Sequence, residues 1–305
     1  MTVLITGVNG FIGQHLSREL QRREIQIRGT ARSSNRSNIK DFVECDLEQV
    51  LSLDKLVMGC NTIIHLAGRA HSKDDGAREK YFSANEDVTC RLIESAIRNG
   101  VKRFVYLSSI KVNGESNDPS TPIKVTDIPR PLDNYGASKL AAEECIKRAC
   151  AQSEMEYVII RPTLVYGKGV RANFDSLIKL VKTGLPIPLR GLRNKRSMIG
   201  VNNLVDLIIT ASTDPAAKNN IFLASDGDDL STPEMIDLIA KALDKKARTF
   251  ALPLALLRII ATVFGRSSDF VKLTGSLTVD LSHTVETLNW QPPFSTALEV
   301  TAAVR

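Results

Sequence analysis

Short apolar runs alternate with amphipathic stretches through the first half of the chain. The runs fall at residues 3–5, 24–31, 41–46, 62–66, 104–107 and 157–160. Stretches with apolar residues at helical spacing lie between several of them, at 49–58, 81–99 and 134–150. Strands that alternate with helices favour a parallel, doubly wound sheet of the Rossmann type. We therefore expect an α/β protein with a nucleotide-binding domain over about residues 1–165.

The rest of the chain, residues 166–305, is expected to form mainly a smaller C-terminal substrate-binding lobe. One or more of its strands can return to the first sheet. In a doubly wound sheet, ligands bind at the carboxyl ends of the strands. Gly7, Asp46, Ala67 and Ser109 follow predicted strands. These residues mark the edge of the sheet at which we expect the site.

A glycine-rich loop follows the first predicted strand. Gly7, Gly10 and Gly13 form a G-x-x-G-x-x-G pattern that opens a helix through Leu20. The first glycine permits a tight turn, the second lets a pyrophosphate approach the backbone, and the third lets helix and strand pack closely. A loop of this kind between a strand and a helix predicts a dinucleotide site. The same loop contributes Asn9, Phe11 and Ile12.

The end of the second predicted strand bears on the choice of cofactor. An NAD site usually places Asp or Glu there, to accept a hydrogen bond from the ribose 2′-hydroxyl. This chain has no acid at that position and has Arg32 instead. An arginine can pair with the 2′-phosphate of NADP, although arginines are also common on surfaces. The sequence therefore favours NADP, with NAD as the alternative.

Tyr135 and Lys139 lie four residues apart on one face of a predicted helix. A phenol with its ordinary pKa of about 10 is a poor base at neutral pH. A neighbouring ammonium favours the phenolate and would bring the pKa of the tyrosine into a useful range. The spacing arises easily by chance, but here it follows a dinucleotide loop and a strand that ends in Ser108 and Ser109. It predicts an acid/base pair.

Composition narrows the possible partners. The chain has 305 residues, of which 43% are hydrophobic and 24% charged, as is typical of a globular protein. A formal charge of +6 fits either attraction of anionic small molecules or simply a surface rich in Lys and Arg. The basic residues are scattered and few aromatic residues lie among them, so we expect no nucleic-acid partner.

Cysteines and apolar segments suggest the environment of the protein. The five cysteines show no C-x-x-C pair and no metal-binding spacing, and their odd count argues against a disulfide framework. We therefore expect reduced thiols, a cytoplasmic location and no metal site. The chain begins directly with a strand, so no signal peptide is expected. The longest apolar run, 252–264, is shorter than the roughly 20 residues that span a bilayer.

Several motifs together resemble the extended short-chain dehydrogenase/reductases of the NAD-dependent epimerase/dehydratase family. The resemblance covers nearly the whole chain and is closest to enzymes that act on nucleotide sugars. The motifs are the glycine loop, Asp46-Leu47, His65 to Gly68, Asn85, Phe104 to Ser109, Tyr135 to Lys139, Arg161-Pro162, Val165 to Gly167 and Leu288 to Pro292.

The resemblance implies roles for particular residues. Ser109 would hydrogen-bond the reacting oxygen, Tyr135 would be the acid/base, and Lys139 would lower the pKa of Tyr135 and hold the nicotinamide ribose. Asp46 and Leu47 would meet the adenine. The remaining implied cofactor contacts are Leu66, Ala67, Gly68, Asn85 and Pro162.

The C-terminal third resembles a sugar-nucleotide lobe. Asn173 would lie near the substrate diphosphate, and Arg196 would clamp it with its planar fork. Lys111 would lie near the sugar because it follows Ser109 closely. The other basic residues between Arg190 and Lys195 fit a solvated loop.

The resemblance leaves more than one reaction open. Ile110 and Lys111 stand where 4,6-dehydratases carry an acidic pair, which argues against dehydratase chemistry. The run from Ser108 to Glu115 is most similar to a subgroup that acts at C4 of UDP-N-acetylhexosamine derivatives. With the NADP preference, this favours a reductase that converts a UDP-2-acetamido-2,6-dideoxy-4-keto-hexose to UDP-N-acetylquinovosamine for surface polysaccharide synthesis. The alternative is a UDP-glucose or UDP-N-acetylglucosamine 4-epimerase with tightly bound NAD.

Two further expectations complete the sequence-based hypothesis. A non-catalytic dinucleotide sensor on the same fold is a rival, but such proteins often lack the Tyr/Lys pair. The helices at 81–99 and 134–150 match those that family members commonly pair across a two-fold axis. The resemblance therefore implies a homodimer.

Overall fold

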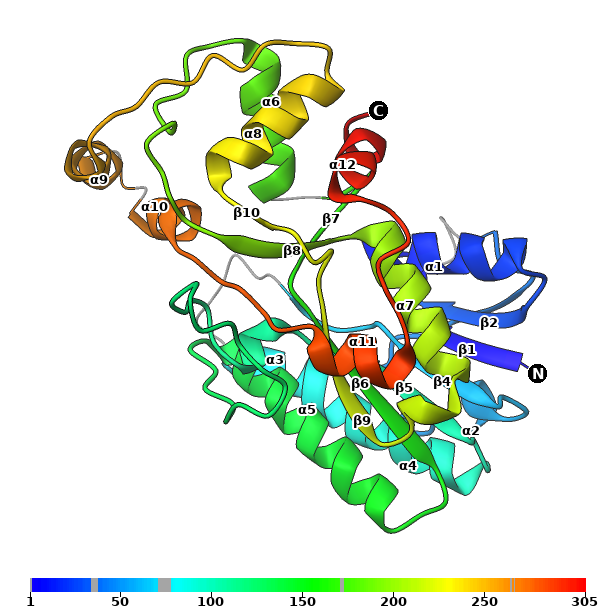
Figure 1. Ribbon diagram of the computed structural model, residues 1–305. Coiled ribbons are helices and arrows are strands. Elements are labelled where there is room, and N and C mark those ends of the chain that lie inside the picture. The colour runs from blue at the N-terminus through cyan, green and yellow to red at the C-terminus, as the bar shows by residue number, and fades with distance from the viewer. Residues whose placement is uncertain (1, 34–37, 71–77, 171–172, 264, 266) are drawn as a thin grey trace.

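The chain is built around a seven-stranded parallel sheet (Figure 1). A computed structural model describes residues 2–33, 38–70, 78–170, 173–263, 265 and 267–305. From one edge of the sheet to the other, the strands are β3 (Asp41–Glu44), β2 (Gln26–Ala31), β1 (Thr2–Thr6), β4 (Thr62–His65), β5 (Arg103–Leu107), β6 (Glu156–Pro162) and β9 (Asn220–Ala224). This order is doubly wound, which confirms the predicted Rossmann-type α/β fold.

Helices cover both faces of the sheet. One face carries α1 (Phe11–Arg22) and α7 (Val201–Thr213), and the other carries α2 (Asp54–Val57), α4 (Val88–Arg98) and α5 (Asn134–Ala151) (Figure 1). Successive strand side chains point to opposite faces. Val3 and Ile5 accordingly pack beneath α1 and α7, whereas Leu4 between them packs on the side of α4 and α5.

A smaller lobe follows the sixth strand. Its sheet joins β7 (Leu164–Tyr166), β8 (Arg196–Gly200) and β10 (Asp229–Leu230). Around it pack α6 (Asn173–Thr183), α8 (Thr232–Ala242) and α12 (Thr296–Val304), which share a core of their own. A capping box between Ser231 and Glu234 starts α8. The helices α9 (Leu254–Val263) and α10 (Ser267–Thr274) stand to one side of this lobe (Figure 1).

The chain passes more than once between the lobe and the large sheet. After the lobe begins, α7 and β9 return to the large sheet, and β9 becomes its edge strand beside β6. The helix α11 (Ser282–Leu288) then lies against β9, and Trp290 joins the core beneath α7. Segments far apart in the sequence therefore hold the two parts together.

Most expected elements of the first half form, with two differences. All six apolar runs contain strands, and the helix expected at 134–150 is α5. The helix expected at 49–58 is limited to the four residues of α2. The amide of Asp54 donates to the hydroxyl of Ser52 at its start, and Gly59 turns the chain after its end with a positive φ of 78°. The helix expected at 81–99 begins as α3 (Arg78–Phe82) and passes through a π-helical turn at Ser83–Asp87 before α4.

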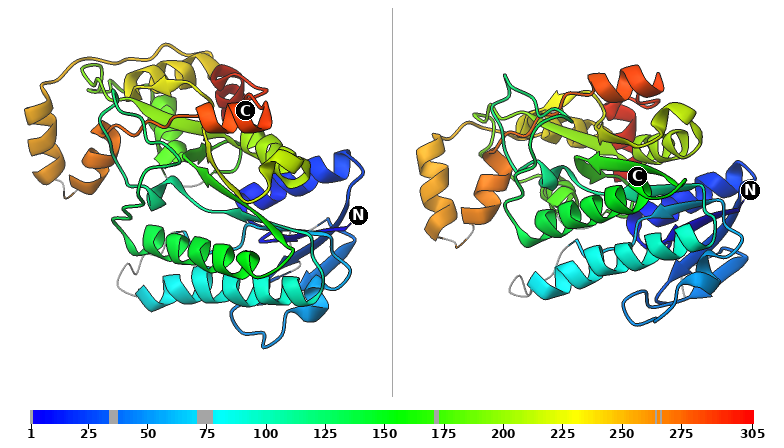
Figure 2. Two further views of the ribbon diagram at one scale, coloured as in Figure 1. Left: turned by 60° about the horizontal axis from the view of Figure 1, so that its bottom comes forward. Right: turned by 90° about the horizontal axis from the view of Figure 1, so that it is seen from below.

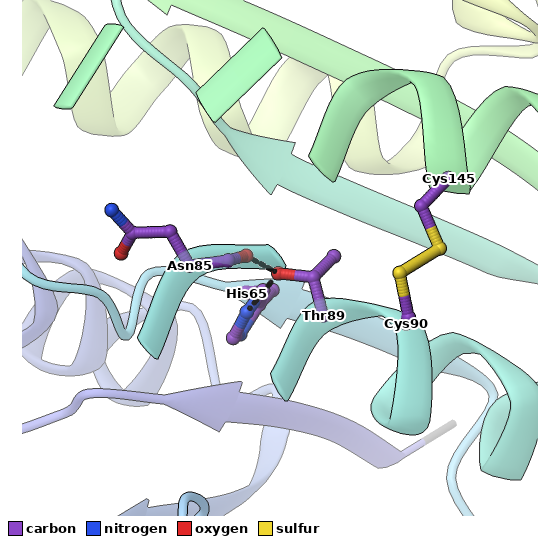
Figure 3. Close-up of a disulfide and its surroundings, with 5 residues drawn as sticks. All are labelled: His65, Asn85, Thr89, Cys90 and Cys145. Carbon is purple, nitrogen blue, oxygen red and sulfur yellow. Dashed lines mark hydrogen bonds between the residues drawn. A yellow bond between two sulfur atoms is a disulfide. The ribbon is translucent and has the colours of Figure 1, made fainter. Parts of the chain in front are cut away.

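The expectation that all thiols are reduced is wrong for one pair of cysteines. The helices α4 and α5 run side by side (Figure 2). Their packing brings Cys90 and Cys145 to a Cα separation of 5.9 Å, and the two form a disulfide across 55 residues of sequence (Figure 3). Spacing along the chain cannot reveal such a pair, since it depends on which helices become neighbours. The cysteines Cys45, Cys60 and Cys150 are free.

Within the described part of the chain, no helix is both long and apolar enough to cross a membrane. The apolar run at 252–264 mostly forms α9, in which Leu254, Ile259 and Val263 are exposed while Leu257 is buried.

Candidate functional site

The glycine loop joins β1 to α1 at the carboxyl edge of the sheet. Gly7 has a φ of +72°, and a Cβ atom there would lie only 2.9 Å from the amide nitrogen of Ala67. A Cβ atom on Gly13 would lie 2.3 Å from the carbonyl oxygen of Gly7. Any larger residue would push the loop away from the helix. The loop therefore presents backbone at the start of α1, where the helix dipole favours anions.

Asn9 lies in this loop and reaches the end of β2. Its Nδ2 donates to the carbonyl oxygen of Ser33 at 2.5 Å. Its Oδ1 is buried and has no hydrogen-bond partner among the described residues, so it can accept one from a bound group. Arg32 beside Ser33 is exposed. The half-buried side chains of Phe11 and Ile12 pack against the core under α1.

The ends of the next strands approach the same edge. Asp46 follows β3, and its carboxylate accepts a hydrogen bond from the amide of Glu48 at 3.1 Å. Leu47 is buried in the core on the α4 side of the sheet. After β4, the amide of Ala67 donates to the hydroxyl of Thr6 at 3.1 Å. Ala67 therefore stands close to the glycine loop, whereas Asp46 and Leu47 follow β3 at the same edge of the sheet.

Asn85 fastens the loop after β4 to α5. It lies in the π-helical turn, a feature often found at functional sites. Its side chain accepts from the amide of Arg69 at 2.8 Å, donates to the carbonyl oxygen of Arg69 at 3.1 Å, and donates to the hydroxyl of Ser138 at 2.9 Å. A Cβ atom on Gly68 would lie 2.7 Å from Asn85 Oδ1 and 3.3 Å from Lys139 Nζ. The side chains of Asn85 and Lys139 thus pack directly against the backbone at Gly68.

Ser109 and Tyr135 meet at the carboxyl end of β5. Ser109 is the N-cap of the short 3-10 helix η2 (Ile110–Val112), and Tyr135 lies in the first turn of α5. Burial raises the pKa of Tyr135 to about 12, against the opposing effects of a hydrogen bond with Ser109 and the positive charge of Lys111. The sequence predicts a lowered pKa for Tyr135, but burial outweighs the hydrogen bond with Ser109 and the charge of Lys111.

Lys139 lies one turn further along α5 and is buried. Its Nζ donates to the carbonyl oxygen of Leu107 at 2.9 Å and sits 4.6 Å from the ring centroid of Tyr106. Burial lowers the pKa of Lys139 to about 8, although the carboxylate of Glu143 acts in the opposite direction. The ammonium is thus held at the floor of the site between β5 and α5.

A buried ion pair between Glu143 and Arg161 holds Ser108, the residue before Ser109. Glu143 accepts from Arg161 at 2.9 Å (Nε) and 2.5 Å (Nη2), and from the hydroxyl of Ser108 at 2.5 Å. Arg161 also donates to the side chain of Asn113 at 3.0 Å. Sequence analysis missed Glu143. The available signal was its position four residues after Lys139 on the buried face of the helix.

The proposed substrate residues lie on three segments. Arg196 opens β8, and its Nη1 donates to the carbonyl oxygen of Gly275 at 3.3 Å. Burial lowers the pKa of Arg196, while the charge of Glu115 opposes the shift. Asn173 begins α6, but its side chain lies outside the described residues. The ammonium of Lys111 is bound by the carboxylates of Glu115 and Asp133.

Other residues named from the sequence have partners within the protein. Pro162 is the last residue of β6 and pairs with Ala224 of β9. Arg190 and Lys195 pair at the surface with Asp237 and Glu234, which agrees with a solvated basic loop.

His65 is a packed core histidine. It is fully buried at the end of β4. Its ring nitrogens lie 2.6 Å from the Thr6 hydroxyl and 3.0 Å from the Thr89 hydroxyl, and Thr89 donates onward to the carbonyl oxygen of Asn85 at 2.5 Å (Figure 3). Burial, together with the charge of Lys139, lowers the pKa of His65 to about 3, so the ring is neutral.

Comparison with known proteins agrees with this arrangement. The family model "NAD dependent epimerase/dehydratase family" matches residues 3–224. A UDP-glucose 4-epimerase from Vibrio cholerae is 42% identical over 298 residues, which cover 96% of this chain and 91% of that protein. The chain belongs to the NAD-dependent epimerase/dehydratase family.

Solved structures share the fold of this family member. A structure described as MoeE5 in complex with UDP-glucose and NAD superposes with a TM-score of 0.81 at 23% identity, covering 100% of this chain and 97% of the other. A UDP-glucuronic acid 4-epimerase from Bacillus cereus in complex with NAD gives a TM-score of 0.80 at 22% identity, covering 100% and 96%.

The residues of this epimerase/dehydratase family member fit a dinucleotide. The glycine loop leaves backbone exposed to a ligand at the start of α1, and the buried Asn9 Oδ1 lacks a partner in the described part of the chain. Gly68 leaves room beside Lys139, where a side chain would clash with Asn85. Within the described ranges, no three His, Cys, Asp or Glu residues are grouped to hold a metal ion.

Proposed function

We propose that this protein is a UDP-sugar 4-epimerase that works with bound NAD. The observation that carries the proposal is the 42% identity to a UDP-glucose 4-epimerase across 96% of the chain, together with the meeting of Ser109 and Tyr135 at the site edge. The 4-keto-sugar reductase favoured by the sequence gains no support from these comparisons. UDP-glucose and UDP-N-acetylglucosamine, with their C4 epimers, are the substrates to test.

The chemistry requires a proton to leave O4 and later return. Tyr135 takes the O4 proton while C4 is oxidised, and gives a proton back once the 4-keto sugar has presented its opposite face. Ser109 donates a hydrogen bond to the same oxygen, where negative charge develops. The pKa of Tyr135, raised to about 12 by burial, opposes the base role. The hydrogen bond with Ser109 and the positive charge of Lys111 favour the phenolate that this role needs.

NAD, when bound, supplies the hydride acceptor and then the hydride donor for C4. The glycine loop and Asn9 would hold its pyrophosphate side, Asp46 and Leu47 its adenine, and Lys139 its nicotinamide ribose. Support for NAD over NADP comes from the family and from solved neighbours that contain NAD. Arg32 is exposed, as a surface arginine would be.

Substrate anchoring is assigned to the lobe. Arg196 at the start of β8 would pair with the diphosphate, and Asn173 at the start of α6 would hydrogen-bond it. Such binding remote from C4 orients the reacting carbon without contributing to the chemistry itself. A homodimer formed through α4 and α5, and a cytoplasmic location, stay predictions.

Purified protein incubated with UDP-glucose and no added cofactor tests the proposal. We expect UDP-galactose to accumulate to equilibrium, measured by ion-exchange chromatography. The variant Tyr135→Phe should lower kcat by about 10²–10⁴-fold, since it removes the acid/base. The matched control is Tyr157→Phe, which removes a hydroxyl in β6 and should leave kcat unchanged.

Two outcomes would overturn the epimerase. One is NADPH oxidation that depends on a 4-keto UDP-sugar, without interconversion of any C4 epimers. The other is full turnover by Tyr135→Phe, which would favour a site elsewhere or a dinucleotide sensor.

A further inference from the structure

The segment that carries Ser109 and the helix that carries Tyr135 are in direct backbone contact. A Cβ atom on Gly136 would lie only 2.6 Å from the carbonyl oxygen of Lys111. The backbones of η2 and of the first turn of α5 are therefore in direct contact, and glycine at position 136 allows this approach.

Lys111 joins the two segments through its side chain. Its Nζ donates to Asp133 Oδ2 at 2.5 Å and to Glu115 Oε1 at 2.7 Å. The other oxygen of Asp133 accepts from the amide of Gly136 at 2.7 Å, and so caps the helix that begins at Asn134. The backbone amide of Lys111 donates to Ser109 Oγ at 3.2 Å.

We propose that Lys111 is a positioning residue, which fixes Ser109 relative to Tyr135 through its ion pair with Asp133. This inference rests on the proposed function. It differs from the sequence-based expectation that Lys111 contacts the sugar. Two carboxylates already bind the ammonium, so a substrate contact would have to compete with both.

The ion pair between Lys111 and Asp133 joins the two segments that carry the reacting groups. A side-chain bond from η2 to the N-cap of α5 limits sliding between the two segments, and both reacting groups lie within two residues of it. The pair is about two-thirds buried, with side-chain exposures of 33% for Lys111 and 37% for Asp133, so solvent screens it only in part. Glu115 extends the connection, because its charge also acts on Arg196.

The geometry predicts a loss of rate without a loss of binding. In Lys111→Met we expect kcat for UDP-glucose to fall by about 10–100-fold, because small misplacements of reacting groups are costly. The Kd of the NAD-loaded enzyme for UDP, measured by calorimetry, should change by less than about 3-fold. A sugar or diphosphate contact would instead weaken binding of UDP-glucose or UDP by about 10-fold or more, with a smaller effect on kcat.

Three variants separate the ion pair from other effects. Asp133→Asn keeps a helix-capping side chain but removes the charge, and should lower kcat as Lys111→Met does. The double variant should be no slower than either single one, since both remove one interaction. Lys111→Arg should recover at least part of the rate. The control is Lys147→Met, which breaks a surface pair with Glu144 on the same helix and should leave kcat unchanged.

Hydrogen exchange provides a readout that does not need turnover. In Lys111→Met, peptides covering 108–116 and 132–140 should exchange faster than in wild type, with the thermal midpoint unchanged within a few degrees; Lys147→Met should show neither change. Unchanged exchange in both peptides would overturn the positioning role even if the protein proved not to be an epimerase. If both peptides exchange faster in Lys111→Met but the wild type converts no UDP-sugar, only the proposed function is overturned.

Discussion

Two networks of buried carboxylates lie in different parts of this molecule, one under the site and one in the lobe. They differ in the kind of donor that surrounds each carboxylate. Beside Ser108, Glu143 faces the guanidinium of Arg161, with contacts of 2.9 and 2.5 Å. Among the described residues, the donors to Asp226, between the lobe sheet and α12, are all neutral: the Tyr166 hydroxyl at 2.6 Å, Asn203, and the amide of Gly200 at 2.9 Å.

Glu299 adds a second carboxyl to the network of the lobe. Its side chain is 1% exposed and packs against Gly200. One oxygen accepts from Asn202 at 3.2 Å, and the other has no partner within the described chain. Burial raises the pKa of Glu299 to about 7, and burial likewise raises the pKa of Asp226.

The two networks differ in whether a cation balances the buried carboxylate. The network under the site carries its own counter-ion, so the carboxylate that holds Ser108 is neutralised inside the protein. The network of the lobe holds carboxyl groups whose ionisation opposes folding. We therefore expect loss of a partner to be most costly in the first network, and a change of pH to act mainly on the second.

Removing the cation should have the largest effect. Arg161→Met leaves Glu143 buried without its partner, and should lower the free energy of unfolding by about 3–5 kcal/mol. Urea denaturation followed by circular dichroism measures this. The double variant Glu143→Leu with Arg161→Met removes both charges and should recover most of the loss. A single variant within about 1 kcal/mol of wild type would show that the pair is not needed.

A pH series should single out Glu299. Its folded-state pKa of about 7 exceeds the ordinary value of 4.5, so the folded protein binds the proton more tightly than the unfolded chain does. The stability due to this group is therefore full below pH 4.5 and falls as the pH rises to about 7. Relative to wild type, Glu299→Gln should gain about 2–3 kcal/mol of unfolding free energy between pH 5 and pH 8. A difference that does not vary with pH would refute the assignment.

The smallest effect should come from the hydroxyl that links the ion pair to the site. Ser108→Ala removes one hydrogen bond to Glu143 while both contacts to Arg161 remain. We expect a loss of about 1 kcal/mol in the free energy of unfolding, measured by the same urea denaturation. A loss as large as that of Arg161→Met would mean that Ser108, and not the cation, holds Glu143.

The sequence predicts the local patterns of this protein but not the contacts between elements that are distant in the chain. Strands, the glycine loop and the Tyr135/Lys139 spacing are local patterns, and the sheet, the glycine loop and the first turn of α5 appear where those patterns predict them. The Glu143–Arg161 pair and the Cys90–Cys145 disulfide depend on which elements become neighbours. No local spacing encodes that choice.

Burial is equally invisible in a local pattern. The pKa of Tyr135 was expected to fall because Lys139 is near, yet the surroundings of the phenol raise it to about 12. The carboxylate partners of Lys111 likewise come from positions 4 and 22 residues away, and the approach of Asp133 depends on how η2 packs against the first turn of α5.

The fate of the C4 hydrogen tests the central claim most directly. Protein is incubated with UDP-glucose deuterated at C4 in the presence of excess unlabelled NADH and NADPH, and the product is analysed by mass spectrometry. An epimerase with retained NAD predicts UDP-galactose that keeps its deuterium, with no consumption of either reduced cofactor. Loss of the deuterium to the cofactor pool would contradict it. So would the absence of UDP-galactose if, in a parallel incubation, a 4-keto UDP-sugar is reduced while NADPH is oxidised.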